Sequence, residues 1–304
     1  MNIRRKTRIN IQKVLDTRAL ACYHTTIPNR TQVQIYFVEE EANKMKKFVA
    51  LLLAVLMVAS LCACGQKDTG SDLQTVTKGK LIMSTNAEFA PYEYVADDGK
   101  GFQGTGYEGI DIEIAYALAQ KLGLELVVDN MDFDAALSAV QTGKSDMVAA
   151  GVTVTPDRLN AMSFTDSYAN GVQVVIVKEG SDIKSIDDLQ GKKIGTQRGT
   201  TGFLYCSDDF GDDNVIGFDD GATAVQNLKA GKIDCVVIDN VPAQEYVKAN
   251  PGLTILDTEY ANEDYAIGIA KDNTALQEAL NKALAELKAD GTIQSIIDKY
   301  IPAK

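Results

Sequence analysis

Apolar and polar positions alternate in two different ways from about residue 80 onward. Short apolar runs bounded by turn residues predict buried strands, and longer segments with apolar residues three and four positions apart predict helices. The predicted strands of this first series are "KLIMSTN", "LELVVDN" and "SDMVAAG", and the predicted helices are "IDIEIAYALAQKLG" and "FDAALSAVQTG". This alternation predicts α/β layers with largely parallel sheets.

A second series of the same kind follows. Its predicted strands are "GVQVVIVK", "KKIGT", "NVIGF" and "DCVVID", and its predicted helices are "TTGFLYCSDD", "GATAVQNLKAG" and "VPAQEYVKA". The two series share an echo, because "AVQTGKSDMVAAG" and "NLKAGKIDCVVID" each run from a helix through Gly-Lys and Asp into a strand. The echo suggests two similarly built lobes. One more strand and two helices complete the chain, from Tyr265 onward.

Ligands of open α/β sheets collect at the carboxyl ends of the strands. In the first series these ends offer Gly151, Thr153 and Arg158. In the second they offer Gly199, Thr200, Thr201 and Asp239.

The stretch "AGVTVTPDR" places an arginine at a helix start. Thr155 suits the N-cap and Pro156 the first helical position. A helix start carries partial positive charge, so Arg158 in the first turn needs an anion as its partner. A surface pair with Asp157 or Asp166 is the ordinary alternative.

The stretch "GTQRGTTG" runs from a strand into a helix, with Gly199 in the turn and Thr200 as N-cap. Its exposed N–H groups form an anion site, and together with Arg158 they suit a carboxylate. Asp239 supplies the opposite charge at the end of "CVVID", or else it caps the next helix. A carboxylate and an ammonium held together define an α-amino acid.

A secretory signal is predicted from Met45, where "MKKFVALLLAVLMVAS" has a charged start and a short apolar core. The following "LCAC" resembles the lipobox of bacterial lipoproteins, with Cys64 as the lipidated residue and residues 65–77 as a polar tether. A signal at residues 45–63 leaves no role for residues 1–44. We therefore expect translation to start at Met45; a basic cytoplasmic extension is the alternative.

Composition narrows the possible functions. The formal net charge is -12; residues 1–63 carry +6, which leaves -18 for the remainder and argues against nucleic acid as a partner. His24 is the only histidine, so a chain processed at Cys64 has none for a catalytic triad or a zinc site. The acidic run "SDDFGDDN" lacks EF-hand spacing and predicts a solvated loop, so no metal or cofactor is expected. Cys206 and Cys235 form either a disulfide or, as the pattern favours, two buried thiols.

Seven segments together resemble the polar amino-acid-binding proteins of ABC importers, the extracellular solute-binding protein family 3. They are "NAEFAPYEY", "GIDIEIAYALAQKLG", "MDFDAAL", "AGVTVTPDR", "SFTDSY", "GTQRGTTG" and "VIDNVPA", within residues 78–302. The resemblance implies an α/β, two-lobed periplasmic-binding-protein-like fold of type II with two hinge strands, near residues 168–172 and 258–264. Lobe 1 would comprise residues 78–170 and 262–304, and lobe 2 residues 171–261.

The resemblance also implies roles for individual residues. Arg158 and the N–H groups of Thr153 and Thr201 would hold the α-carboxylate, while Asp239 and the Gly151 carbonyl would hold the α-ammonium. Phe89 and Phe133 would sandwich the ligand; residue type alone favours both as core aromatics. The side-chain pocket would involve Asn86, Glu88 and Gln197, and Thr200 would also bind the ligand. Asn86 and Glu88 are equally compatible with a turn.

The expected function is a monomeric, lipid-anchored receptor outside the cytoplasm that binds an L-amino acid, polar or cationic, and presents it to an ABC permease. A dehydratase-like enzyme on the same scaffold is one alternative, although Glu88 is its sole acid–base candidate. An amino-acid sensor that signals to another membrane protein is the other.

Overall fold

The computed structural model describes residues 73–302, in which two larger sheets and one small sheet form. The first sheet contains β1 (Lys80–Thr85), β5 (Glu125–Asn130), β6 (Met147–Val148), β7 (Met162–Phe164) and β14 (Gly268–Ala270). The second contains β8 (Ala169–Lys178), β9 (Ile194–Gln197), β10 (Val215–Phe218), β11 (Cys235–Asp239), β12 (Leu253–Ile255) and β13 (Ala261–Tyr265). The small sheet contains β2 (Glu88–Phe89), β3 (Glu93–Val95) and β4 (Tyr107–Glu108).

Helices cover both larger sheets. The α-helices are α2 (Ile110–Leu122), α3 (Phe133–Gln141), α4 (Pro156–Ala161), α5 (Thr201–Phe210), α6 (Gly221–Lys229), α7 (Asn240–Ala249), α8 (Thr274–Ala289) and α9 (Thr292–Tyr300). Residues 73–302 also contain three short 3₁₀ helices: η2 (Phe102–Gly104), η3 (Ile186–Leu189) and η4 (Asp212–Asn214). None of the helices within residues 73–302 is both long enough and apolar enough to cross a membrane.

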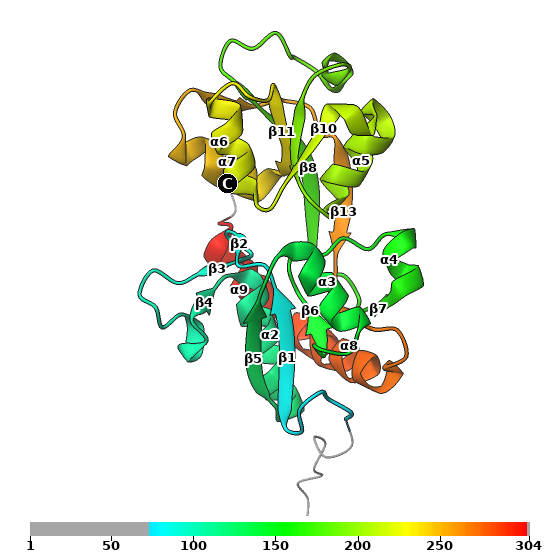
Figure 1. Cartoon of the computed structure of the whole chain (residues 1–304). Helices are drawn as coiled ribbons and strands as arrows, with labels where there is room; N and C mark the ends of the chain where they lie inside the picture. The colour runs from blue at the N-terminus through cyan, green and yellow to red at the C-terminus, as the bar shows by residue number, and fades with distance from the viewer. Residues whose placement is uncertain (1–72, 303–304) are drawn as a thin grey trace, which may run out of the picture. The chain divides into compact units, whose positions relative to one another are not determined.

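Each larger sheet is the centre of one lobe (Figure 1). The strand order is β5-β1-β6-β14-β7 in the first lobe and β10-β9-β11-β8-β12 in the second, where β13 also pairs with β8. The expected two-lobed α/β fold is confirmed. The expectation of largely parallel sheets is wrong in part, because β7, β8, β12, β13 and β14 take part in antiparallel pairs. Two of these strands, β8 and β13, are the strands along which the chain crosses between the lobes.

Successive side chains along a strand point to opposite faces of its sheet, and both faces of each larger sheet are buried. In β8, Val174 and Ile176 pack on the side of α6 and α7, whereas Val175 and Val177 pack on the side of α5. A strand buried on both faces therefore appears in the sequence as the continuous apolar run "VVIV". The strand β6 divides in the same way, with Met147 in one core cluster and Val148 in the other.

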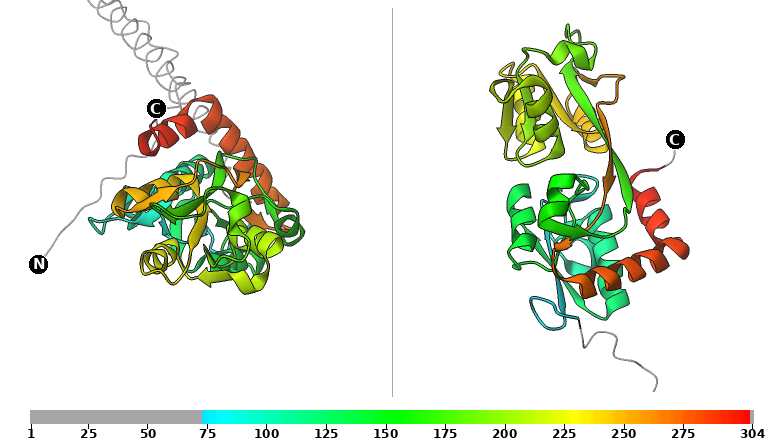
Figure 2. Two further views of the ribbon diagram at one scale, coloured as in Figure 1. Left: turned by 90° about the horizontal axis from the view of Figure 1, so that it is seen from above. Right: turned by 90° about the vertical axis from the view of Figure 1, so that its right-hand side faces the viewer.

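The chain crosses between the lobes along two paired strands. β8 and β13 are antiparallel, and their register runs from Ala169 opposite Tyr265 to Gln173 opposite Ala261. Figure 2 shows these strands side by side, in green and orange, between the lobes. The two segments expected to act as hinges thus meet in one two-stranded ribbon.

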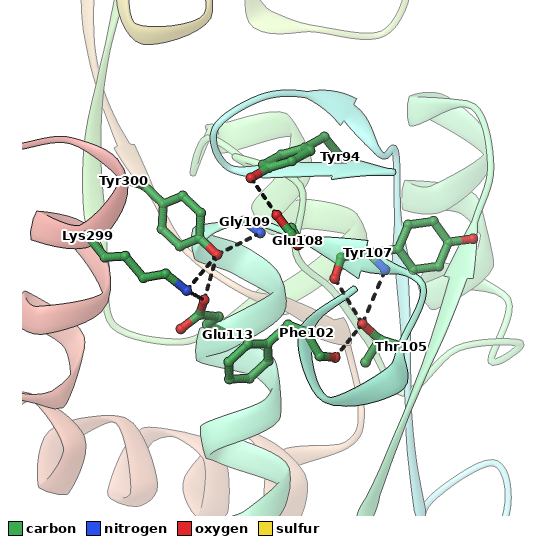
Figure 3. Close-up of polar contacts among 9 residues, drawn as sticks. All are labelled: Tyr94, Phe102, Thr105, Tyr107, Glu108, Gly109, Glu113, Lys299 and Tyr300. Carbon is green, nitrogen blue, oxygen red and sulfur yellow. Dashed lines mark hydrogen bonds and ion pairs between the residues drawn. The ribbon is translucent and has the colours of Figure 1, made fainter. Parts of the chain in front are cut away.

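A polar cluster attaches the C-terminal helix α9 to the first lobe (Figure 3). Glu113 on α2 accepts a hydrogen bond from the Tyr300 hydroxyl and pairs with the Lys299 ammonium. The Tyr300 oxygen in turn accepts the Gly109 N–H at 3.3 Å. Because Gly109 lies between β4 and α2, the cluster also holds the small sheet that carries Phe89.

Two further sequence expectations can be compared with the structure. Cys206 and Cys235 are free thiols, both fully buried in the core of the second lobe, so the favoured alternative is confirmed. The acidic run at residues 207–214, expected to be a solvated loop, instead forms the end of α5 and the helix η4. Phe210 within this run packs against the core. The many acidic residues around it had favoured an exposed loop.

Candidate functional site

A cavity lies between the two lobes. It is lined by Asn86, Phe89, Glu93, Phe133, Ala150, Gly151, Thr153, Arg158, Gln173, Gln197, Thr200, Thr201, Val237, Ile238, Asp239 and Tyr265. The structure therefore brings together all the sequence-predicted site residues except Glu88. Their roles toward a ligand stay predictions, but their shared location follows from the carboxyl ends of β1, β6, β9 and β11 facing one another.

Arg158 is held rigidly at one end of this cavity. Thr155 caps α4 by accepting the Arg158 N–H at 3.2 Å, which fixes the backbone of the first turn. The guanidinium donates to the Thr153 carbonyl at 2.9 Å and to the Gly199 carbonyl at 3.0 Å. Its carbon lies 5.4 Å from the centre of the Phe133 ring.

This guanidinium has no carboxylate within 4.0 Å among the residues described. Arg158 is only 7% exposed, and burial lowers its pKa from the ordinary value. A surface pair with Asp157 or Asp166 is thus ruled out. A buried cation without an anionic partner is costly, and such a group suits an anionic ligand group.

The start of α5 meets Arg158 from the opposite lobe. Gly199 has a φ of +72°, and a Cβ there would lie 3.1 Å from Asp134 Cβ. Thr200 caps the helix by accepting the Phe203 N–H at 3.3 Å, as the sequence predicted. The first N–H groups of α5 therefore lie at the pocket beside the guanidinium, and a helix N-terminus and an arginine at one point suit a carboxylate.

Asp239 provides the opposite charge at the other end. One of its oxygens accepts the Val172 N–H and the Tyr265 hydroxyl, both at 2.9 Å, and the other accepts the Val241 N–H at 3.0 Å. Asp239 thus caps α7 and also faces the pocket, so the predicted helix cap and the predicted pocket position are both found. Burial raises its pKa to about 6, and no Lys or Arg in the described range forms an ion pair with it.

Two aromatic rings form walls of the cavity. Phe89 stacks on Tyr92 with ring centres 5.5 Å apart, and a Cβ at Gly151 would lie 2.8 Å from its ring. Phe133 belongs to the apolar core of the first lobe and also lies against Arg158. Both rings therefore pack against the apolar core and also line the cavity, so the two interpretations of these residues are compatible.

Asn86 and Gln197 join the lobes across the cavity. The Gln197 amide donates to Asn86 Oδ1 at 2.8 Å and to the Asp219 carbonyl at 3.0 Å. Glu88 is absent from the cavity lining and is exposed. The pKa of Glu88 is raised, mainly by partial burial and then by the charges of Asp220, Asp132 and Asp219. Glu88 therefore belongs to an acidic cluster outside the cavity lining.

Sequence reasoning missed Glu93, Gln173 and Tyr265 among the polar lining residues. Gln173 and Tyr265 lie on the crossing strands β8 and β13, and the Gln173 amide donates to Glu263 at 2.9 Å. The residue order gives no sign that they reach the pocket, because that depends on pairing between strands far apart. For Glu93, the only available signal was a carboxylate inside the aromatic stretch "PYEYV".

A pocket between two α/β lobes, crossed by paired strands and bearing unpaired charges of both signs, defines a two-lobed solute-binding protein. The family of bacterial extracellular solute-binding proteins, family 3, matches residues 81–303, and the chain belongs to this family. Its members are substrate-binding proteins of ABC importers and not enzymes, which excludes the dehydratase-like alternative.

Curated relatives cover most of the chain. It is similar to the arginine-binding extracellular protein ArtP of Bacillus subtilis, with 33% identity over 84% of this chain and 98% of the relative. It is also similar to the ABC transporter arginine-binding protein 1 of Escherichia coli, with 34% identity over 73% of this chain and 91% of the relative. Among solved structures, an ancestral arginine-binding protein bound to glutamine has 40% identity and a TM-score of 0.69, covering 75% of this chain and 100% of that one.

Proposed function

We propose that this solute-binding protein is a lipid-anchored receptor that closes on an L-amino acid and delivers it to an ABC permease. The observation that carries the proposal is the pair of buried charges without ionic partners, Arg158 and Asp239, in one cavity. A free α-amino acid presents a carboxylate to the first and an ammonium to the second. Family membership supports the class of receptor, and the anchor at Cys64 lies outside the described residues.

A cationic side chain is the favoured ligand feature. The chain from residue 64 onward carries a net charge of -18, and the charges of Asp220, Asp132 and Asp219 all act on Glu88. No Lys or Arg other than Arg158 lines the cavity. The two curated relatives described above are called arginine-binding proteins, and a solved ancestral arginine-binding protein is bound to arginine. These names support a basic ligand for this chain as well.

A thermal-shift screen of the common L-amino acids tests the proposal. We expect arginine and lysine to raise the melting temperature most, with a dissociation constant in the micromolar range or tighter, which corresponds to about 8 kcal/mol or more. Neutral polar amino acids such as glutamine should give smaller shifts. Shifts with sugars, metal ions or peptides alone would contradict the amino-acid assignment, and a preference for acidic amino acids would contradict the cationic one.

A further inference from the structure

Two carboxyl groups lie buried at the cavity on neighbouring elements, because the Asp111 N–H donates to the carbonyl of Tyr92, the residue before Glu93, at 2.9 Å. Glu93 on β3 is 0% exposed and Asp111 on α2 is 1% exposed. Both oxygens of Glu93 and Oδ1 of Asp111 lack a hydrogen-bond partner among the residues described. No Lys or Arg in that range lies within 4.0 Å of either group.

Such a pair must hold a proton, because two adjacent buried carboxylates without a cation repel each other strongly. Asp111 Oδ2 already accepts the Gly151 N–H at 2.9 Å and the Tyr168 hydroxyl at 2.7 Å. These donors stabilise Asp111 as the anion. Glu93 has no such donors, so the proton resides on Glu93.

The electrostatics agree with this placement. Burial, and then the charge of Asp111, raises the pKa of Glu93 well above its ordinary value of 4.5. Burial raises the pKa of Asp111 to about 6, while the hydrogen bonds from Gly151 and Tyr168 lower it. The other ionisable groups facing the pair are Tyr92 and Tyr168. Neither of these is a cation, so the proton is what relieves the repulsion.

The pair is connected to the cavity through Gly151. This residue has a φ of +54°, and the Phe89 and Tyr265 rings crowd the position where a Cβ would stand. Its N–H is fixed by Asp111, and Glu93 itself lines the cavity beside it. Glu93, Asp111 and Gly151 thus form one connected wall next to Asp239.

We propose that Glu93 is a positioning residue for the ammonium end of the ligand: it acts as a neutral acid that donates its proton to Asp111 and so fixes the Gly151 peptide on the cavity wall. The part that concerns the ligand rests on the proposed function. The part that concerns the shared proton holds without any ligand.

The shared proton has a signature in the stability of the protein. A carboxyl group whose pKa is raised by folding stabilises the folded state fully below its unfolded pKa, and this contribution is lost as the pH rises through the folded pKa. Stability should therefore fall as pH rises above the ordinary value of 4.5 for Glu93. Glu93→Gln removes the titration but keeps a donor for Asp111, and it should flatten this fall.

The experiment compares the full chain in detergent with its Glu93→Gln and Glu93→Met variants. Urea unfolding without ligand, from about pH 5 to about pH 8, tests the proton. Calorimetry with the amino acid that gives the largest thermal shift tests the positioning. We expect Glu93→Gln to bind within about twofold of the unmodified chain, because its amide replaces the donor. Its stability should fall less steeply with pH than that of the unmodified chain, and the remaining fall reflects Asp111 and Asp239, whose pKa values are also raised. We expect Glu93→Met, which has similar length and no donor, to bind at least about tenfold more weakly.

Equal pH slopes for the unmodified chain and Glu93→Gln would overturn the shared proton. Equal affinities of Glu93→Met and Glu93→Gln would overturn the positioning role. If Glu93→Met does not fold, tight binding by Glu93→Gln supports the role and weak binding overturns it. If no amino acid binds any variant, the proposed function fails instead, and the pH comparison still decides where the proton resides.

Discussion

Arg158 combines two fixed donors with burial, and this combination is specific to a guanidinium. Two of its nitrogens donate to carbonyl groups, one in each lobe, at 2.9 and 3.0 Å. An ammonium is a point charge and does not reproduce this fork. We therefore expect Arg158→Lys to weaken amino-acid binding by about a hundredfold, within the range of about 2–5 kcal/mol for truncating one partner of a buried charge pair. Calorimetry measures this loss.

Asp157→Asn is the matched control, since Asp157 is the neighbour on the same helix turn and is exposed. Removing its charge should change the affinity by no more than about twofold, because exposed charge pairs contribute little. A large loss in Asp157→Asn together with a small loss in Arg158→Lys would mean that the guanidinium serves the fold rather than the ligand.

Asp239 makes binding depend on pH. Its pKa is raised to about 6 by burial, so in the free protein it gains a proton as the pH falls through about 6. An ammonium ligand prefers the ionised form and must displace that proton. The affinity should therefore be constant above this pH and fall by up to about tenfold per pH unit below it. Titration calorimetry at several pH values measures this dependence of affinity on pH. The variant Asp239→Asn should bind weakly, and its affinity should change less with pH. An unchanged slope in that variant would assign the effect to another group.

The paired strands β8 and β13 are the elements on which the cavity depends. Gly171 on β8 lies opposite Glu263, and a Cβ at Gly171 would lie 2.4 Å from the Tyr265 ring, whose hydroxyl donates to Asp239. We expect Gly171→Ala to displace this ring, to destabilise the fold by about 1–3 kcal/mol and to weaken ligand binding. Urea unfolding and calorimetry measure the two effects.

Gly180→Ala serves as the control for that substitution. Gly180 follows β8 with a φ of +77°, and no atom lies within 4 Å of its added Cβ. The variant should lose about 1–2 kcal/mol to backbone strain alone and keep its affinity. If both variants bind equally well, the Tyr265 ring is not what couples the crossing strands to the cavity.

The elements that residue order predicts well are those with local signals. Thr155-Pro156 and Gly199-Thr200 each specify a helix start within a few residues, and the chain places both at the cavity. The small sheet, the pairing of the two hinge strands, and the pocket side chains of Glu93 and Tyr265 were not predicted. Strands of two or three residues and the pairing of β8 with β13 depend on contacts distant in sequence, which single-chain patterns do not encode.

At the scale of the whole molecule, the proposed sites of ligand recognition and lipid anchoring lie on separate parts of the chain. The cavity is built within residues 73–302, while the lipobox cysteine Cys64 lies outside that range. We expect Cys64→Ser to release the protein from membranes while leaving its affinity unchanged, because two acyl chains supply stable anchoring and the lobes supply recognition. Membrane fractionation checks this, and a variant that stays tightly membrane-bound would refute the anchor.

If the cavity recognises both ends of a free amino acid, modifying either end of the ligand should weaken binding. Calorimetry of the strongest amino-acid ligand, its methyl ester and its N-acetyl derivative measures this, since the ester lacks the carboxylate and the acetyl form lacks the ammonium. We expect tight binding of the free amino acid and at least about a hundredfold loss for each derivative, as for truncation of a buried charge pair. Equal binding of either derivative would contradict the assignment of Arg158 or Asp239 to that end.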